Sequence, residues 1–171
     1  MSLPLGNIPH ELKLLIISQF TTSINCSPAL SRTIGGTIRI KELWINRSHR
    51  RRGADDQGLV ICEMPMCDEM RSRDGGLDLT MLSAIVDLCS ALSLQALALS
   101  NGGMGDGVSH NMTLTFHEVP TPKGTLRITS STVSMSQNEM TSRCEVWEKE
   151  TGGLIATAVH TKIPTATVAK L

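Results

Sequence analysis

The chain has 171 residues, of which 40% are hydrophobic and 19% are charged, and its formal net charge is zero. This length suffices for one domain with a hydrophobic core, and the composition excludes a chain that is disordered throughout. The balanced charge argues against a dedicated nucleic-acid-binding protein, which would carry an excess of Lys and Arg.

The first 34 residues predict a helix followed by a connecting segment. Over residues 8–20 the apolar side chains recur near helical spacing, and Pro9 suits a first helical turn. Residues 21–34 are rich in Ser and Thr and predict a connection. We therefore assign residues 1–34 to an N-terminal helical extension.

Alternating apolar side chains predict half-buried strands at 37–45 and 59–66, separated by a polar loop. After a charged loop, residues 78–99 predict a long helix that is apolar on most of its surface and must be buried. This stretch is long enough to cross a bilayer. Because Asp78 and Asp87 would be costly there, the buried helix of a soluble protein is favoured and no membrane span is expected.

Four further strands are predicted, joined by short turns, at 108–118, 125–135, 139–148 and 154–162. Consecutive strands with short turns pair in an antiparallel sheet, and one very apolar helix needs a curved sheet to cover it. The predicted class is therefore α+β, with a curved antiparallel sheet wrapped around one long helix. Such a layer leaves an open edge and face, so we expect a homodimer or a dimer of dimers.

The five cysteines show no spacing typical of a metal site or of a disulfide framework. No Cys-x-x-Cys pair or Cys/His cluster occurs, so we expect reduced thiols in an intracellular protein, no metal and no cofactor. The tail, residues 164–171, ends in Ala169-Lys170-Leu171, a conservative variant of the peroxisomal Ser-Lys-Leu signal. It predicts recognition by a peroxisomal import receptor, with a cytoplasmic location as the alternative.

Several segments together resemble the hotdog-fold acyl-CoA thioesterases, of the phenylacetic-acid and thioesterase-superfamily-member-2 types. The resemblance is carried by residues 59–64, 85–87, 107–113 and 151–162, in that order, and it extends over residues 35–163. It implies a hotdog domain that hydrolyses acyl-CoA to a free acid and CoA at a site between two subunits.

The resemblance also implies the roles of individual residues. Asp87 takes the position of the carboxylate that acts as general base or nucleophile, and Ser109 takes that of a Ser or Thr which orients the reactants. Ser72 falls where the family has Asn or Gln. Amides at the N-terminus of the long helix are expected to polarise the thioester carbonyl.

The chain departs from the family at the start of this helix. The His-Gly-Gly of the family falls on Asp78-Leu79-Thr80. If the match to the family is shifted by a few residues, Gly75 and Gly76 take the positions of the two glycines and Asp74 takes that of the His. Gly76 is then a candidate for the oxyanion site, with Gly75 and Asp78 beside the substrate. Contacts to CoA are implied for Asn111, Ser136, Gln137, Asn138 and Lys162.

Asp87 also stands out by its surroundings, because it lies in the middle of an apolar helix. An unpaired carboxylate there would be expensive, so a pocket or a partner must relieve the cost. A structural role in capping or in pairing with an Arg is the alternative to catalysis.

Two other functions remain open. A hydratase or dehydratase would pair an Asp with a His in one motif, which His110 and His117 do not provide. A non-catalytic hotdog protein that binds acyl-CoA or a protein partner would fit the loss of His-Gly-Gly.

Overall fold

The computed structural model describes residues 3–34, 36–48, 56–117 and 123–165. The helices are α1 (His10–Asn25), α2 (Pro28–Ile34), the short 3-10 helix η1 (Asp68–Met70) and α3 (Leu79–Ser100). The strands are β1 (Arg39–Asn46), β2 (Gln57–Pro65), β3 (Gly107–Phe116), β4 (Thr125–Met135), β5 (Met140–Glu148) and β6 (Leu154–Pro164).

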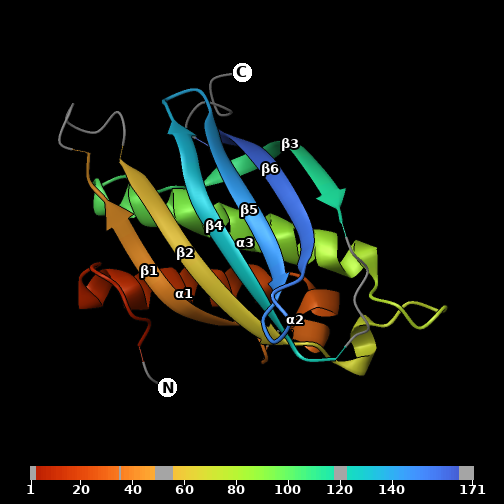
Figure 1. Ribbon diagram of the computed structural model, residues 1–171. Coiled ribbons are helices and arrows are strands. Elements are labelled where there is room, and N and C mark those ends of the chain that lie inside the picture. Colours follow the sequence, from red (N-terminus) through yellow and green to blue (C-terminus); the bar gives the residue numbers. More distant parts are fainter. Residues whose placement is uncertain (1–2, 35, 49–55, 118–122, 166–171) are drawn as a thin grey trace.

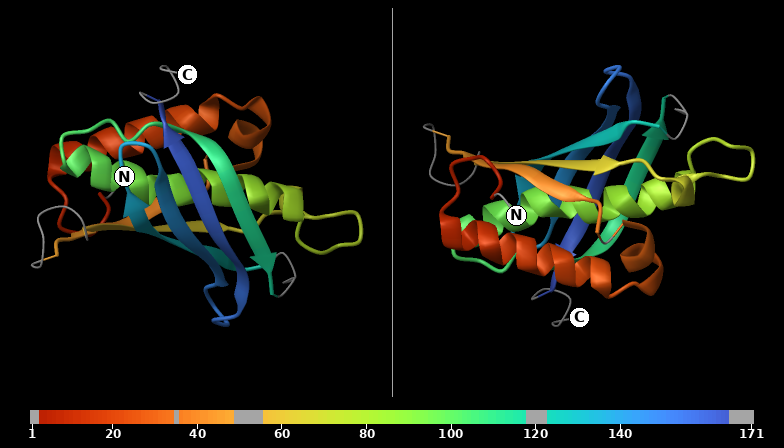
Figure 2. Two further views of the ribbon diagram at one scale, coloured as in Figure 1. Left: turned by 90° about the horizontal axis from the view of Figure 1, so that it is seen from above. Right: turned by 90° about the horizontal axis from the view of Figure 1, so that it is seen from below.

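The six strands form one antiparallel sheet in the order β1-β2-β4-β5-β6-β3. The sheet curves around α3, which lies along its concave side, and α1 lies next to α3 (Figures 1 and 2). This confirms the predicted α+β class and hotdog architecture. The two edges of the sheet are β1 and β3.

Helix α3 is buried because its side chains are apolar on nearly every face. Its interior positions include Leu82, Ile85, Val86 and Leu97, each at most 2% exposed. By length and composition alone α3 could cross a membrane, but 61% of its most apolar window is buried inside the protein. It is the central helix of the core.

The predicted connection at 21–34 is wrong, because α1 continues to Asn25 and α2 occupies most of the remainder. The hydroxyls of Thr21, Thr22 and Ser23 donate to the carbonyls of Ile17, Ser18 and Gln19, one helical turn earlier. Hydroxyl residues favour turns and caps in isolation. Burial of Ile24 in the core outweighs that preference, and Pro28 begins α2 at the position where proline is favoured.

The N-terminal extension packs into the same core as the sheet. Ile16, Phe20 and Ile24 of α1 belong to the hydrophobic cluster that surrounds α3. Upstream, the Leu5 amide donates to the Lys41 carbonyl, and the Leu5 carbonyl accepts from the Leu43 amide. The extension thereby covers part of the β1 edge.

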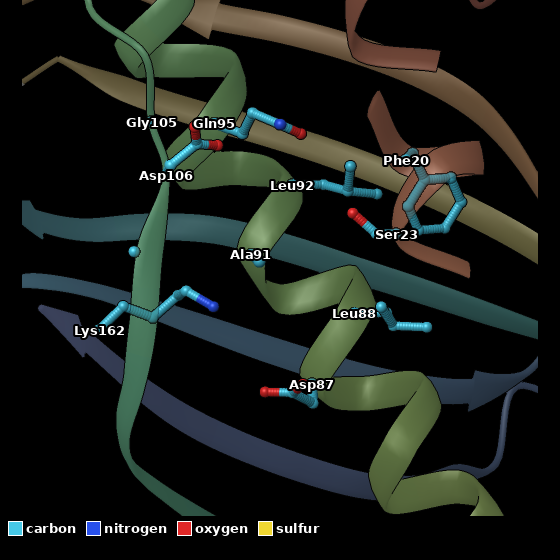
Figure 3. A pocket seen from close by; sticks show the side chains of 11 residues that line it. Phe20, Ser23, Asp87, Leu88, Ala91, Leu92, Gln95, Gly105, Asp106 and Lys162 are labelled. Atoms are coloured by element: carbon cyan, nitrogen blue, oxygen red, sulfur yellow. The ribbon is translucent and has the colours of Figure 1, made fainter. Parts of the chain in front are cut away.

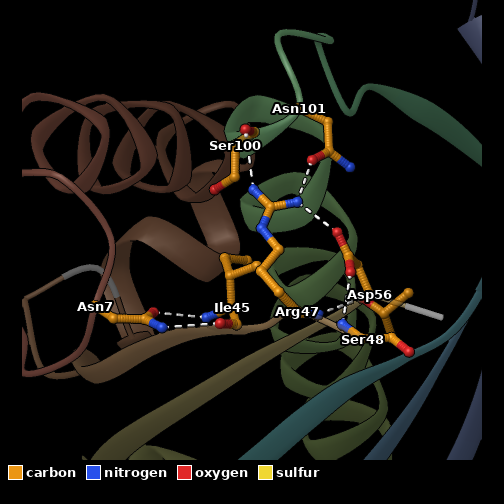
Figure 4. Close-up of polar contacts among 9 residues, drawn as sticks. Asn7, Ile45, Arg47, Ser48, Asp56, Ser100 and Asn101 are labelled. Carbon is orange, nitrogen blue, oxygen red and sulfur yellow. Dashed lines mark hydrogen bonds and ion pairs between the residues drawn. The ribbon is translucent and has the colours of Figure 1, made fainter. Parts of the chain in front are cut away.

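Polar contacts fix the C-terminal end of α3 to β1 and β2 (Figure 4). The Arg47 guanidinium lies 2.5 Å from Asp56 Oδ2 and also donates to Asn101 Oδ1 and to the Ser100 carbonyl. A cation at the end of a helix is favoured by the free carbonyls and the dipole there. Hydrogen bonds from Arg47 and the Ser48 amide hold the pKa of the Asp56 carboxyl below its usual range.

The tripeptide Ala169-Lys170-Leu171 lies outside the described residues. The peroxisomal location therefore stays a prediction from the sequence.

Candidate active site

Asp87 lies near the middle of α3 on the face turned toward β3 and β6. Its side chain is 44% exposed, so the carboxylate is at the border of the core rather than inside it. Ser109, near the start of β3, donates a hydrogen bond of 3.0 Å from its hydroxyl to Asp87 Oδ1. The two residues matched to the catalytic Asp and Ser are thus brought together by the fold.

His160 of β6 is a further side chain at this site, which the sequence-based set of site residues did not include. Its ring is fully buried, with Nε2 at 3.3 Å from Asp87 Oδ1 and Nδ1 at 2.7 Å from the Ser90 hydroxyl. Burial lowers the pKa of His160, Asp87 acts in the opposite direction and Lys162 adds to the lowering. The imidazole is therefore neutral at physiological pH. The alternation along β6, which buries Ala156, Ala158 and His160 on one face, was the available signal.

Lys162 lies two residues further along β6. Its Nζ lies 3.3 Å from the Ser109 hydroxyl. Burial lowers the pKa of Lys162, while Asp87 and Asp106 oppose that effect. The predicted binding residue Lys162 thus places its amino group beside the Asp87–Ser109 pair.

Asp87 and Lys162 border a cavity of about 150 Å³ (Figure 3). Its floor is one stripe of α3, made by Leu88, Ala91, Leu92 and Gln95 at the i, i+3, i+4 and i+7 positions. In Figure 3, Asp87 and Lys162 lie on one side of this stripe, and Phe20 of α1 lies on the other. The cavity thus has a polar side for reacting groups and an apolar side.

The predicted residues Ser72, Gly75 and Gly76 form a closed turn before α3. The Ser72 amide donates to the Gly76 carbonyl and the Gly75 amide to the Ser72 carbonyl. The Ser72 hydroxyl donates to the Asp74 carboxylate and also lies 3.1 Å from the Gly76 carbonyl. Gly75 has a φ of +87°, which glycine adopts without strain. None of the three residues contacts Asp87 in the same chain.

Asp78 is the N-cap of α3. Its Oδ1 accepts from the amides of Thr80 at 2.8 Å and Met81 at 3.2 Å, which satisfies two of the free amides in the first turn. Among the described residues, no hydrogen bond partner is found for the Leu79 amide. A single backbone donor therefore remains at the start of α3, next to a carboxylate.

Within one chain the start of α3 and Asp87 cannot contact the same thioester group. At the usual rise of about 1.5 Å per residue, Leu79 and Asp87 are about 12 Å apart along the helix. The predicted oxyanion donors and the predicted carboxylate therefore belong to two separate places on the subunit.

The remaining predicted contacts for CoA lie at the Asp87 end of the sheet. The strand register places Lys162 beside Ser109 on β3 and beside Met140 on β5, so the turn at 136–139 adjoins Lys162. In this turn the Ser136 hydroxyl accepts from the amides of Asn138 and Glu139 and has a structural role. Asn111 is exposed on β3, and Gln137 and Asn138 are exposed in the turn.

A metal centre is not formed by the described part of the chain. There, no group of three or more His, Cys, Asp or Glu side chains could hold an ion. Burial raises the pKa of the Cys144 thiol to about 12, and a hydrogen bond with Cys62, together with burial, raises that of Cys89. These core cysteines are therefore poor nucleophiles.

No protein-family model and no curated protein matches the sequence. Solved structures do match. Thioesterase superfamily member 2 of zebra fish has 22% identity and a TM-score of 0.67, covering 86% of this chain and 94% of its own. A hypothetical thioesterase from Streptococcus pneumoniae, solved with coenzyme A, has 15% identity and a TM-score of 0.66, covering 87% and 96%.

A third similar structure is a mutant of the phenylacetic acid degradation protein PaaI from Thermus thermophilus. It has 14% identity and a TM-score of 0.60, covering 81% of this chain and 99% of its own. All three alignments span most of both chains, so the likeness concerns the whole architecture. The chain therefore shares its hotdog fold with these structures.

Proposed function

We propose that the protein hydrolyses acyl-CoA thioesters to a free acid and CoA. The observation that carries the proposal is the contact of Asp87 with Ser109, at 3.0 Å, beside Lys162 and a cavity with an apolar side. The coenzyme A in the similar S. pneumoniae structure supports the choice of a CoA ester.

In this mechanism Asp87 acts as the general base. It accepts a proton from a water molecule that Ser109 orients, and the water oxygen attacks the thioester carbonyl carbon. The carbon–sulfur bond then breaks, and the proton passes from Asp87 to the leaving CoA sulfur. Neutral His160 lies beside the carboxylate without cancelling its charge, and Lys162 attracts the anionic substrate.

The carbonyl oxygen needs a hydrogen-bond donor as its negative charge develops. The Leu79 amide can supply one only to a thioester held at the Asp87 of a second subunit, because the two positions in one chain are too far apart. We therefore propose a homodimer with two shared sites, in which β3, an edge strand of the sheet, pairs with its copy.

The test is release of free thiol from short, medium, long and aromatic acyl-CoA esters. Asp87→Asn should lower kcat by roughly 10²–10⁴-fold, the usual contribution of a general base. Ser109→Ala should lower it less. Asp106→Asn removes another carboxylate from the same cavity and leaves the Asp87–Ser109 pair intact. Its kcat should therefore fall far less than that of Asp87→Asn. Equal activity of Asp87→Asn and wild type would exclude the mechanism.

A second candidate, a protein that binds acyl-CoA without hydrolysing it, is favoured by Asp78. A carboxylate at the start of α3 opposes the charge that develops on the thioester oxygen. Binding of acyl-CoA by calorimetry, together with no turnover of any ester in the panel, would support this function over the first.

A further inference from the structure

The cavity beside Asp87 is small for a long acyl chain. Its volume is about 150 Å³. An engineered apolar cavity of about 150 Å³ in another protein binds benzene, whereas sites for larger ligands usually have about 300–1,000 Å³. Its apolar side therefore has room for a compact acyl group.

Phe20 of α1 closes the apolar side of this cavity. The ring is 6% exposed and belongs to the hydrophobic core. The neighbouring Gln19 is tied to the cavity floor, because Gln95 donates a hydrogen bond of 2.6 Å to its side-chain oxygen. This contact holds α1 against α3 beside the ring.

A second and larger space also borders Phe20. This groove has a volume of about 820 Å³, and Phe20 borders both it and the cavity. Its apolar lining includes Ile17 and Ile24 of α1, Ile40 of β1 and Ile38, which directly precedes β1. The charged side chains at the groove are largely paired: Arg127 bridges Glu63 at 3.2 Å and Glu42 at 3.4 Å.

We infer that Phe20 limits the length of the acyl group accepted beside Asp87, so that the protein acts on short acyl-CoA esters. This inference rests on the proposed function, which it extends from the bond that is broken to the class of acyl group. A longer chain would have to displace a ring packed in the core, and protein interiors leave little space for that. Without the ring, the chain could continue into the apolar groove.

The experiment compares acetyl-, butanoyl-, decanoyl- and palmitoyl-CoA as substrates of the wild type and of Phe20→Ala. The wild type should prefer the two short esters. Phe20→Ala should raise the ratio of kcat/KM for palmitoyl-CoA over butanoyl-CoA by at least about tenfold, a gain within reach of a few buried methylenes. Ile24→Ala removes a buried side chain that borders the groove only, and it should leave the ratio unchanged.

A second variant keeps the test decisive if Phe20→Ala does not fold. Ser23 is exposed on α1 and lines the cavity, so Ser23→Phe adds a ring without disturbing the core. It should suppress butanoyl-CoA turnover while acetyl-CoA turnover persists. An unchanged order of esters in Ser23→Phe, or a wild type that prefers palmitoyl-CoA, would overturn the inference.

The two proposals fail in different ways. Turnover of every ester without the length limit would refute only the role of Phe20. If no ester is hydrolysed, calorimetric binding of the same esters still measures the limit. Tight butanoyl-CoA binding and weak palmitoyl-CoA binding, reversed in Phe20→Ala, would then support the role of Phe20, and equal binding would refute it.

Discussion

At the scale of single residues, the site depends on how differently Asp87 and His160 are exposed. The Asp87 carboxylate reaches solvent, whereas the His160 ring 3.3 Å away is fully buried. A buried imidazole resists protonation, because its charge would lose hydration. The Asp87 carboxylate therefore lies at the border of the core beside a neutral neighbour, where a water molecule can reach it.

The lowered pKa of His160 predicts how stability depends on pH. The unfolded chain binds a proton at His160 with a pKa near 6.5, whereas the folded protein binds it only at lower pH. The unfolded state then holds more protons below pH 6.5. The contribution of His160 is thus fully present above that value and is lost as pH falls through the folded pKa.

We therefore expect the free energy of unfolding, measured by urea titration, to fall as the pH drops below about 6.5, by about 1.4 kcal/mol for each unit by which folding lowers the His160 pKa. His160→Gln should flatten this decline. His117→Gln, at an exposed histidine, serves as the control and should keep it. An equal decline in both variants would assign it to other groups.

At the scale of elements, the start of α3 combines a good helix cap with an unfavourable charge. Asp78 stabilises the helix by accepting from two amides, and an N-cap residue of this kind contributes about 1 kcal/mol. The same carboxylate lies beside the Leu79 amide, the donor proposed for the thioester oxygen. Asp78 thus stabilises the helix, but its charge weakens the stabilisation that the Leu79 amide would give to a negative thioester oxygen.

Asp78→Asn separates these two effects, because asparagine caps a helix about as well as aspartate and carries no charge. We expect kcat to rise while the melting temperature hardly changes. Asp78→Ala removes both charge and cap and should lower the free energy of unfolding by about 1 kcal/mol. A lower kcat in Asp78→Asn would show that the carboxylate assists the reaction.

At the scale of the whole molecule, the proposed reaction needs groups that one chain holds about 12 Å apart along α3. The exposed side chains of β3, an edge strand, leave that strand open for pairing with a second copy. A site shared between subunits follows from the proposed function, and mixed dimers can test it.

Two inactive variants should restore activity when they are refolded together. Asp87→Asn removes the base. Leu79→Pro removes one amide at the position where a helix best tolerates proline. A mixed dimer holds one intact site and one doubly altered site, so about a quarter of wild-type turnover is expected for random pairing. No recovery, with mixed dimers verified by mass, would exclude the shared site.

The sequence by itself determined the hotdog architecture, and it matched Asp87 and Ser109 to one site, where the structure brings them into contact. Strand alternation and the long apolar α3 admit few arrangements, because each apolar face must be covered. The pairing of Asp87 with Ser109 followed from the matched segments, since both residues occupy regular elements in a fixed order.

Only the tertiary structure decided the rest. The helical course of residues 21–34 depends on burial of Ile24, which outweighs local preferences. The place of His160 beside Asp87 depends on how β6 packs against α3. The role proposed for Phe20 in limiting the acyl group depends on where α1 packs against α3. These features result from contacts between segments far apart in the chain, and local sequence patterns indicate which side chains are buried but not which distant residues they contact.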